Sequence, residues 1–145
     1  MRVAIGSDHA GFDQKERLRH HLIASGYEVV DVGTGSAEES VDYPDFAGSV
    51  ARHVADGTVD RGVLVCGTGI GMAIAANKVD GVRAANVTDP QFARLAREHN
   101  DANVIALSGR FVPEQVNEEI IDAFLSTDFG GQRHRRRLDK ISELE

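Results

Sequence analysis

The apolar residues of this chain follow two alternating spacings. Short runs of consecutive apolar residues, typical of buried parallel strands, recur five times. Between them, apolar residues recur every three or four positions, as in helices that bury one face. This alternation predicts a single parallel sheet with helices on both faces. The predicted strands are residues 2–6, 27–32, 62–66, 82–87 and 103–107.

Proline and glycine set the limits of the predicted helices. Three prolines stand where a helix can begin, because the first turn has no use for the missing N–H. Gly26 and the pair Gly130-Gly131 interrupt the chain after helical segments. The last helix is so charged that it has little to bury alone, so we expect it to pack on a partner subunit. The predicted helices are residues 12–24, 44–55, 72–76, 90–98, 113–125 and 132–144.

Composition narrows the class of protein. The 145 residues are 41% hydrophobic and 27% charged, which suits one domain, residues 1–145. A single cysteine cannot form an intramolecular disulfide, and no apolar run approaches the roughly 20 residues that span a bilayer. We therefore expect a cytoplasmic protein without a membrane partner. The net charge of −7 argues against nucleic acid as a partner, and an anionic substrate would need a local positive site.

Residues 63–78 organise the rest of the chain. An apolar strand, 63–65, runs through Gly67, Gly69 and Gly71 into a segment of good helix formers. Such a turn leaves backbone N–H groups free, and with the helix dipole they favour an anion. Cys66, the only cysteine, stands where the strand ends, and a thiol at a helix start can serve as an acid–base group. The alternatives are an ordinary glycine turn and a small buried core cysteine.

Polar residues follow three of the predicted strands. They are Asp8-His9, the segment 66–71, and Ser108-Gly109-Arg110. Ligands of parallel sheets bind outside the carboxyl ends of the strands, so these groups are expected to converge there. Asp8 could instead be only a turn residue that caps the following helix.

Two further groups carry candidate chemistry. His99, followed by Asn100, could shuttle protons at the strand-end edge, although histidine is also common at helix ends. Arg133 and Arg137 lie one helical turn apart and could bind a phosphate together, with Arg110 as a third cation. The arginine run could equally be a solvated charged face. Cysteine and histidine spacings show no metal site.

Several motifs together resemble the ribose-5-phosphate isomerase type B family, which includes galactose-6-phosphate isomerase subunits. The resemblance covers essentially the whole chain, in order. The motifs are Ser7-Asp8-His9-Ala10-Gly11-Phe12, Asp42-Tyr43-Pro44, Cys66-Gly67-Thr68-Gly69-Ile70-Gly71 with Ala75-Ala76-Asn77-Lys78, Arg97-Glu98-His99-Asn100, and Arg133-His134 with Arg137.

The resemblance implies a three-layer α/β/α sandwich with a five-stranded parallel, Rossmann-like sheet. It also implies a homodimer or homotetramer with shared active sites, and no metal or organic cofactor. By position, Cys66 would be the base, His99 would assist ring opening, and Thr68 would join the catalytic residues. The implied substrate-binding residues are Asp8, His9, Tyr43, Gly67, Thr68, Gly69, Ile70, Gly71, Asn100, Arg110, Arg133 and Arg137.

The expected function is the interconversion of ribose 5-phosphate and ribulose 5-phosphate through an enediolate. A tetrose 4-phosphate, allose 6-phosphate or galactose 6-phosphate would be an alternative substrate, because one sequence does not give the pocket length. A non-catalytic phosphosugar-binding module would keep the anion-binding loop but would need neither Cys66 nor His99. A nucleic-acid-binding protein that uses the arginine run is a third possibility.

Overall fold

A computed structural model describes residues 1–145 as five parallel strands and six helices. The sheet has the order β2-β1-β3-β5-β4, and every neighbouring pair is parallel. The predicted parallel sheet with helices on both faces is therefore confirmed. The strands are β1 Arg2–Ser7, β2 Glu28–Asp31, β3 Arg61–Cys66, β4 Ala84–Asn86 and β5 Val104–Ser108.

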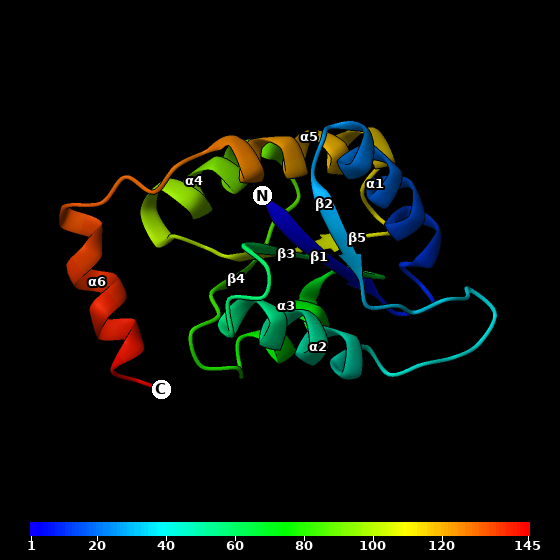
Figure 1. Cartoon of the computed structure of the whole chain (residues 1–145), viewed down its shortest axis with the longest axis horizontal. Helices are drawn as coiled ribbons and strands as arrows, with labels where there is room; N and C mark the ends of the chain where they lie inside the picture. The colour runs from blue at the N-terminus through cyan, green and yellow to red at the C-terminus, as the bar shows by residue number, and fades with distance from the viewer.

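Helices cover both faces of this sheet. Three helices, α1, α4 and α5, lie above it in Figure 1, and α2 and α3 lie below it. Helices α1, α2, α3 and α4 begin and end close to the predicted limits, and prolines stand at the first turns of α2 and α4. The helices are α1 Phe12–Ala24, α2 Tyr43–Ala55, α3 Ile70–Ala76, α4 Pro90–Asn100, α5 Glu114–Ser126 and α6 Arg133–Ser142.

The two faces of the sheet carry different cores. Under α1, α4 and α5 the core is built from large side chains such as Leu18, Ile120 and Phe124. Under α2 and α3 it is built mainly from alanine and valine, with Leu64 and Met72 as its largest fully buried side chains. The start of α3 lies near the end of β3, because only residues 67–69 join the two elements.

The edge strands are shorter than the sequence predicts. β2 lacks Tyr27 and Val32, and β4 lacks Val82, Arg83 and Val87. The N–H of Arg83 bonds to the side chain of Asn103 instead of to a strand, and the N–H of Val82 closes a turn on Val79. An edge strand pairs on one side only, so local turns compete with its ends more easily.

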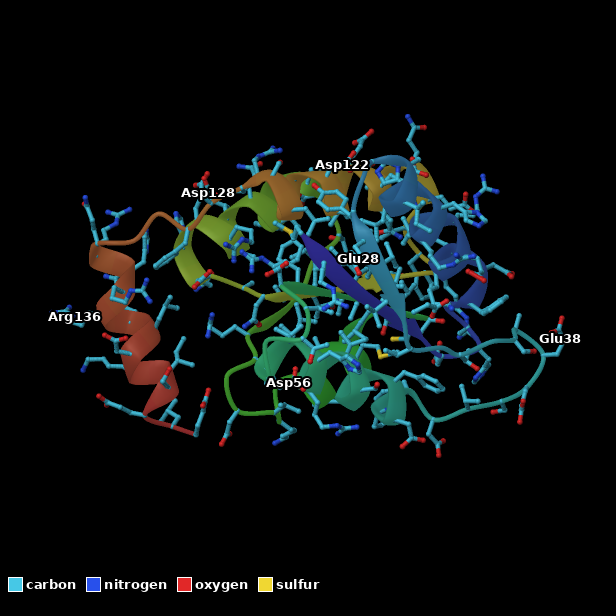
Figure 2. The ribbon with its side chains drawn as sticks, viewed as in Figure 1. Glu28, Glu38, Asp56, Asp122, Asp128 and Arg136 are labelled. Atoms are coloured by element: carbon cyan, nitrogen blue, oxygen red, sulfur yellow. The ribbon has the colours of Figure 1, made fainter.

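Helix α6 stands apart from the three layers, at the left of Figure 1. One side chain of it, Leu138, is buried, and Arg136 points away from the body of the molecule in Figure 2. The connection is fixed where the Gly130 N–H bonds to the carbonyl of Glu98 at 2.9 Å. No helix of the structure is both long and apolar enough to cross a membrane.

Candidate active site

Three strand ends meet at the carboxyl edge of the sheet, as predicted. β1, β3 and β5 are neighbours, and backbone hydrogen bonds tie together the segments that follow them. The N–H of Gly109 bonds to the carbonyl of Cys66 at 2.8 Å, and that of Arg110 bonds to Gly67 at 3.1 Å. The N–H of Asp8 bonds to the carbonyl of Val65 at 3.3 Å. The site residues of this edge therefore share one rigid backbone frame.

Cys66 lies at the centre of this frame. The residue is 5% exposed, and the Gly69 N–H donates to its Sγ at 3.1 Å. Gly69 needs to be glycine, because its φ is +83° and a Cβ would lie 2.4 Å from the side-chain nitrogen of Asn86. That Asn86 amide also donates to the carbonyls of Thr68 and Ala106. The thiol is thus held in a tight loop whose shape is fixed from β4 and β5.

The other loop residues are also where the sequence suggested. The Thr68 hydroxyl accepts the Ile70 N–H at 3.1 Å, so its own proton remains available to a ligand. A Cβ on Gly71 would lie 2.7 Å from the ring of Tyr43, which places that ring against the loop. A Cβ on Gly67 would lie 3.3 Å from a guanidinium nitrogen of Arg110. A cation and a phenol therefore flank the glycine loop.

Asp8 and His9 follow β1 at the same edge. Asp8 is 8% exposed, and its Oδ1 accepts the Gly11 N–H at 3.0 Å, so the turn role weighed for this residue is present. His9 is half-buried, and its Nδ1 accepts the Val41 N–H at 3.1 Å. The second carboxylate oxygen of Asp8 and Nε2 of His9 make no hydrogen bond within the chain.

A buried amide network, which the sequence did not reveal, supports this edge. Gln14 donates to the carbonyls of Gly109 and Val112, and Asn117 donates to Gln14 and to the carbonyl of Ser108. The Ser108 hydroxyl in turn donates to the carbonyl of Gly67 at 2.8 Å. A signal did exist, because Gln14 shares helical spacing with Leu18 and therefore occupies a core position.

The remaining predicted site residues lie at the opposite edge of the sheet. Helix α4 runs antiparallel to the strands, so His99 and Asn100 at its end lie near the start of β5. The length of β3 separates the two edges, which is about 17 Å at 3.3 Å per residue. The prediction that His99 stands at the strand-end edge is therefore wrong for a single chain. Arg133 and Arg137 lie beyond it, on α6.

His99 is paired with another histidine at this end of the molecule. Its ring stacks on that of His134, with centroids 4.5 Å apart. Partial burial lowers the pKa of His134 from its ordinary value of 6.5, and the neighbouring His99 and two arginines lower it further. A small open pocket lies between the end of α4 and residues 130–134. We refer to His99, Asn100, Arg133 and Arg137 as the α4–α6 group.

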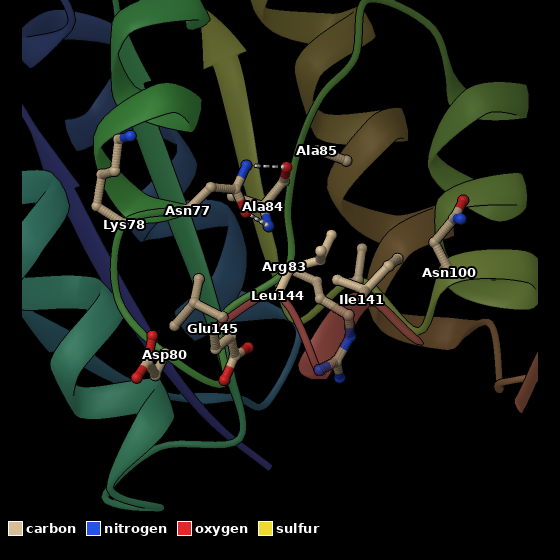
Figure 3. A pocket seen from close by; sticks show the side chains of 12 residues that line it. Asn77, Lys78, Asp80, Arg83, Ala84, Ala85, Asn100, Ile141, Leu144 and Glu145 are labelled. Atoms are coloured by element: carbon tan, nitrogen blue, oxygen red, sulfur yellow. Dashed lines mark hydrogen bonds between the residues drawn. The ribbon is translucent and has the colours of Figure 1, made fainter. Parts of the chain in front are cut away.

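The largest cavity lies between α6 and the β4 region, away from Cys66. It has a volume of about 680 Å³ and is lined by Ile141 of α6, by Leu144 just beyond the helix, and by Arg83 and Asn100 (Figure 3). Ile141 is 42% exposed and Leu144 is 86% exposed. An apolar helix face left open over such a hollow is typical of an interaction surface.

No metal or cofactor site is evident in the geometry. No group of three or more His, Cys, Asp or Glu side chains is arranged to hold a metal ion. The carboxyl edge instead offers a buried thiol, hydrogen-bond donors around a glycine loop, and one guanidinium. Such a set of groups suits an enzyme that moves a proton on an anionic substrate.

Comparison with known proteins identifies the family of the chain. The model of the ribose/galactose isomerase family matches residues 3–141. The chain therefore belongs to this family and is an aldose–ketose isomerase, which confirms the family and enzyme class expected from the sequence.

Three similar proteins illustrate the range of the family. The chain is 45% identical to Escherichia coli ribose-5-phosphate isomerase B, over 99% of this chain and 96% of that protein. It is 41% identical to the D-erythrulose-4-phosphate isomerase of Pectobacterium atrosepticum, over 100% and 95%. A structure of Mycoplasma genitalium ribose-5-phosphate isomerase B with bound ribulose-5-phosphate superposes with a TM-score of 0.95, at 46% identity, over 99% and 95%.

Proposed function

We propose that this protein interconverts ribose 5-phosphate and ribulose 5-phosphate, with Cys66 as the base. The observation that carries the proposal is the buried thiol, held by the Gly69 N–H at 3.1 Å inside a loop of hydrogen-bond donors. The bound ribulose-5-phosphate of the Mycoplasma genitalium homologue supports the choice of substrate.

The chemistry requires a base and a place for negative charge. Cys66 takes the proton from C2 of the open-chain aldose, which leaves an enediolate with charge on O1. Returning that proton to C1, while the O2 hydroxyl proton passes to O1, gives the ketose. A positioned base contributes typically 10²–10⁴-fold. The backbone N–H groups of Gly67, Thr68 and Gly71, which have no partner within the chain, and the Thr68 hydroxyl are the donors for the developing oxyanion.

The remaining roles are distributed around this centre. Asp8, His9 and Tyr43 contact the sugar, and Arg110 over Gly67 is the one cation that this chain brings to the loop. The phosphate group of a sugar phosphate is a dianion, and the single positive charge of one guanidinium does not neutralise it. Arg133 and Arg137 supply the missing charge, His99 assists ring opening and Asn100 contacts the sugar only if a second copy presents them.

The surface of the chain supports a homodimer with shared sites. Ile70 and Ile74, on α3 beside the glycine loop, are 54% and 60% exposed. Ile141 and Leu144 form a second open apolar surface on α6. Packing the α6 of one copy near the α3 of another would cover both surfaces. It would also bring the partner subunit's α4–α6 group to Cys66.

The test is turnover of ribose 5-phosphate by the wild type, Cys66→Ala and Cys66→Ser. We expect the wild type to convert it and Cys66→Ala to lose at least 100-fold in kcat. The affinity of Cys66→Ala for ribose 5-phosphate, measured by calorimetry, should change little because the hydrogen-bond donors of the glycine loop remain. Unchanged turnover of Cys66→Ala would contradict the role of the thiol. Absence of turnover by folded wild type would favour a phosphosugar-binding module.

A four-carbon sugar phosphate is the second candidate, because a relative 41% identical over the full length is named for such a substrate. The two candidates are separated by kcat/KM measured side by side on four-, five- and six-carbon phosphates. A preference for the four-carbon sugar would leave the mechanism intact and change the substrate.

A further inference from the structure

We propose that residues 33–42 fix His9 as a neutral imidazole with its proton on Nε2, so that His9 is a hydrogen-bond donor to the substrate and moves no proton. We call this segment the 33–42 loop; it joins β2 to α2. The identity of the ligand rests on the proposed function. The state of the ring rests on the structure alone.

The contact of Nδ1 determines the state of the ring. The backbone N–H of Val41 donates to Nδ1 at 3.1 Å, across 32 residues of chain. A ring nitrogen that accepts an N–H uses its lone pair and carries no proton. An imidazolium would instead direct a second N–H at that of Val41. The hydrogen bond therefore selects the neutral ring with Nε2 protonated.

The Nε2–H group remains available to a ligand. It makes no hydrogen bond within the chain, and it is not among the buried unpaired polar atoms. It lies at the carboxyl edge, where Arg110 and the unpaired backbone N–H groups of Gly67, Thr68 and Gly71 are also donors. Phosphate and enediolate oxygens are acceptors, so a ring that can only donate matches such a ligand.

The 33–42 loop is anchored firmly enough to hold the ring. At its start, the Ser7 N–H bonds to Gly33 at 2.8 Å, and the Thr34 N–H bonds back to Ser7 at 2.9 Å. Asp31 accepts the Gly33 N–H at 2.9 Å and also pairs with Lys15, which is 1% exposed. At its end, the loop meets His9. The loop is therefore bonded to Ser7 at its start and to His9 at its end, two residues that lie at and just after the end of β1.

The other histidine assigned to the site differs in this respect. The ring of His99 stacks on a side chain and accepts no backbone N–H. The geometry thus separates the two histidines, because a backbone hydrogen bond orders the ring of His9 and stacking alone places the ring of His99.

The first experiment reads the ring directly. Full-length protein labelled with ¹⁵N-histidine is examined by long-range ¹H–¹⁵N correlation at neutral pH, with His9→Asn to assign the signals. We expect His9 to show an unprotonated Nδ1 and a protonated Nε2, with or without inorganic phosphate. A protonated Nδ1, or a mixture of both tautomers, would overturn the proposal.

The second experiment removes the donor. Val41→Pro lacks the N–H, whereas Val41→Ala keeps it, and Ser40→Pro places proline at the neighbouring exposed residue, whose N–H has no partner. We expect both tautomers in Val41→Pro, with kcat nearly unchanged and KM about twofold higher for an even mixture, because only the Nε2-protonated fraction can donate. Both controls should match the wild type. A wild-type tautomer and KM in folded Val41→Pro would contradict the proposal.

A third pair of variants covers the case in which Val41→Pro does not fold. Glutamine at position 9 can place a donor near the Nε2 position, and asparagine can place an acceptor near Nδ1. We expect His9→Gln to bind ribose 5-phosphate more tightly than His9→Asn, and the reverse order would refute the donor role. If the wild type turns over no sugar phosphate, the proposed function fails, while the tautomer is still decided by the spectrum and by phosphate titration.

Discussion

The carboxyl edge of the sheet and the α4–α6 group are built in opposite ways. At the carboxyl edge, backbone bonds join Asp8 and Gly109 to β3 and Arg110 to Gly67 just after it, and buried amides of Gln14 and Asn117 support this backbone. At the other end, Arg133 and Arg137 are exposed and form no ion pair within the chain. One region is organised before any ligand arrives, and the other presents unneutralised positive charge. The reacting atoms need the first property, and a docking partner can use the second.

The strongest test of this comparison is to mix two inactive variants. If each site combines Cys66 of one copy with the α4–α6 group of another, Cys66→Ala and His99→Ala/Arg137→Ala are each inactive alone. A mixed dimer of the two has one intact site. After refolding them together in equal amounts, we expect about a quarter of wild-type turnover, from statistical pairing.

The matched control replaces the second chain by Cys66→Ala/His99→Ala/Arg137→Ala, which cannot supply a thiol. That mixture should stay inactive. Failure of the first mixture to recover turnover, although mixed dimers are present by mass spectrometry, would show that one chain carries the whole site.

A second test isolates the rigidity of the carboxyl edge. Gly69 and Gly57 have similar φ values, +83° and +79°, but a Cβ meets nothing within 4 Å at Gly57. Alanine at Gly57 should cost about 1 kcal/mol in the free energy of unfolding, measured in urea. Alanine at Gly69 should cost more, because its Cβ would also lie 2.4 Å from the Asn86 side chain and 3.0 Å from the Leu107 backbone. Because only Gly69→Ala displaces Asn86 and the thiol's donor, only this variant should lose turnover, by about 100-fold. Equal turnover in the two variants would contradict the picture of a preorganised loop.

The smallest effect is expected where α6 meets α4. The pKa of His134 is lowered in the folded chain, so the unfolded chain binds more protons below about pH 6.5. His134 therefore stabilises the packing of α6 against α4 fully above that pH, and this stabilisation is lost as the pH falls. Hydrogen exchange of α6 amides should accelerate modestly between about pH 7.5 and 5.5, after correction for intrinsic rates. In His134→Phe, which keeps an aromatic ring against His99, the acceleration should disappear; if it persists, another group is responsible.

Much of the fold and part of the site could be predicted from the sequence. The alternation of apolar runs with helical spacing determined the sheet and its covering, and glycine and proline marked most boundaries. Asp8, Cys66 and Arg110 were expected together because each follows a strand, and the order β1-β3-β5 brings those ends side by side. Local patterns sufficed here because strand direction is the same for all five strands.

The rest depended on contacts that local patterns do not contain. His99 was misplaced because it lies at a helix end, and helices of this fold run opposite to the strands. The partners of Gln14, including Asn117, lie more than 90 residues away along the chain, so spacing reveals that this amide faces the core but not which groups it binds. The bond between His9 and Val41 spans 32 residues and likewise has no local signature.

The solitary cysteine gives the protein a built-in chemical reporter. A thiol reagent can react at one position of the chain, and that position is shielded by the glycine loop. In denaturant the sulfur is accessible, so the amount of bound label gives the number of chains. In native buffer, the labelling rate measures how often the glycine loop exposes the sulfur. A saturating sugar phosphate should slow that reaction, so ligand occupancy can be read without following any product.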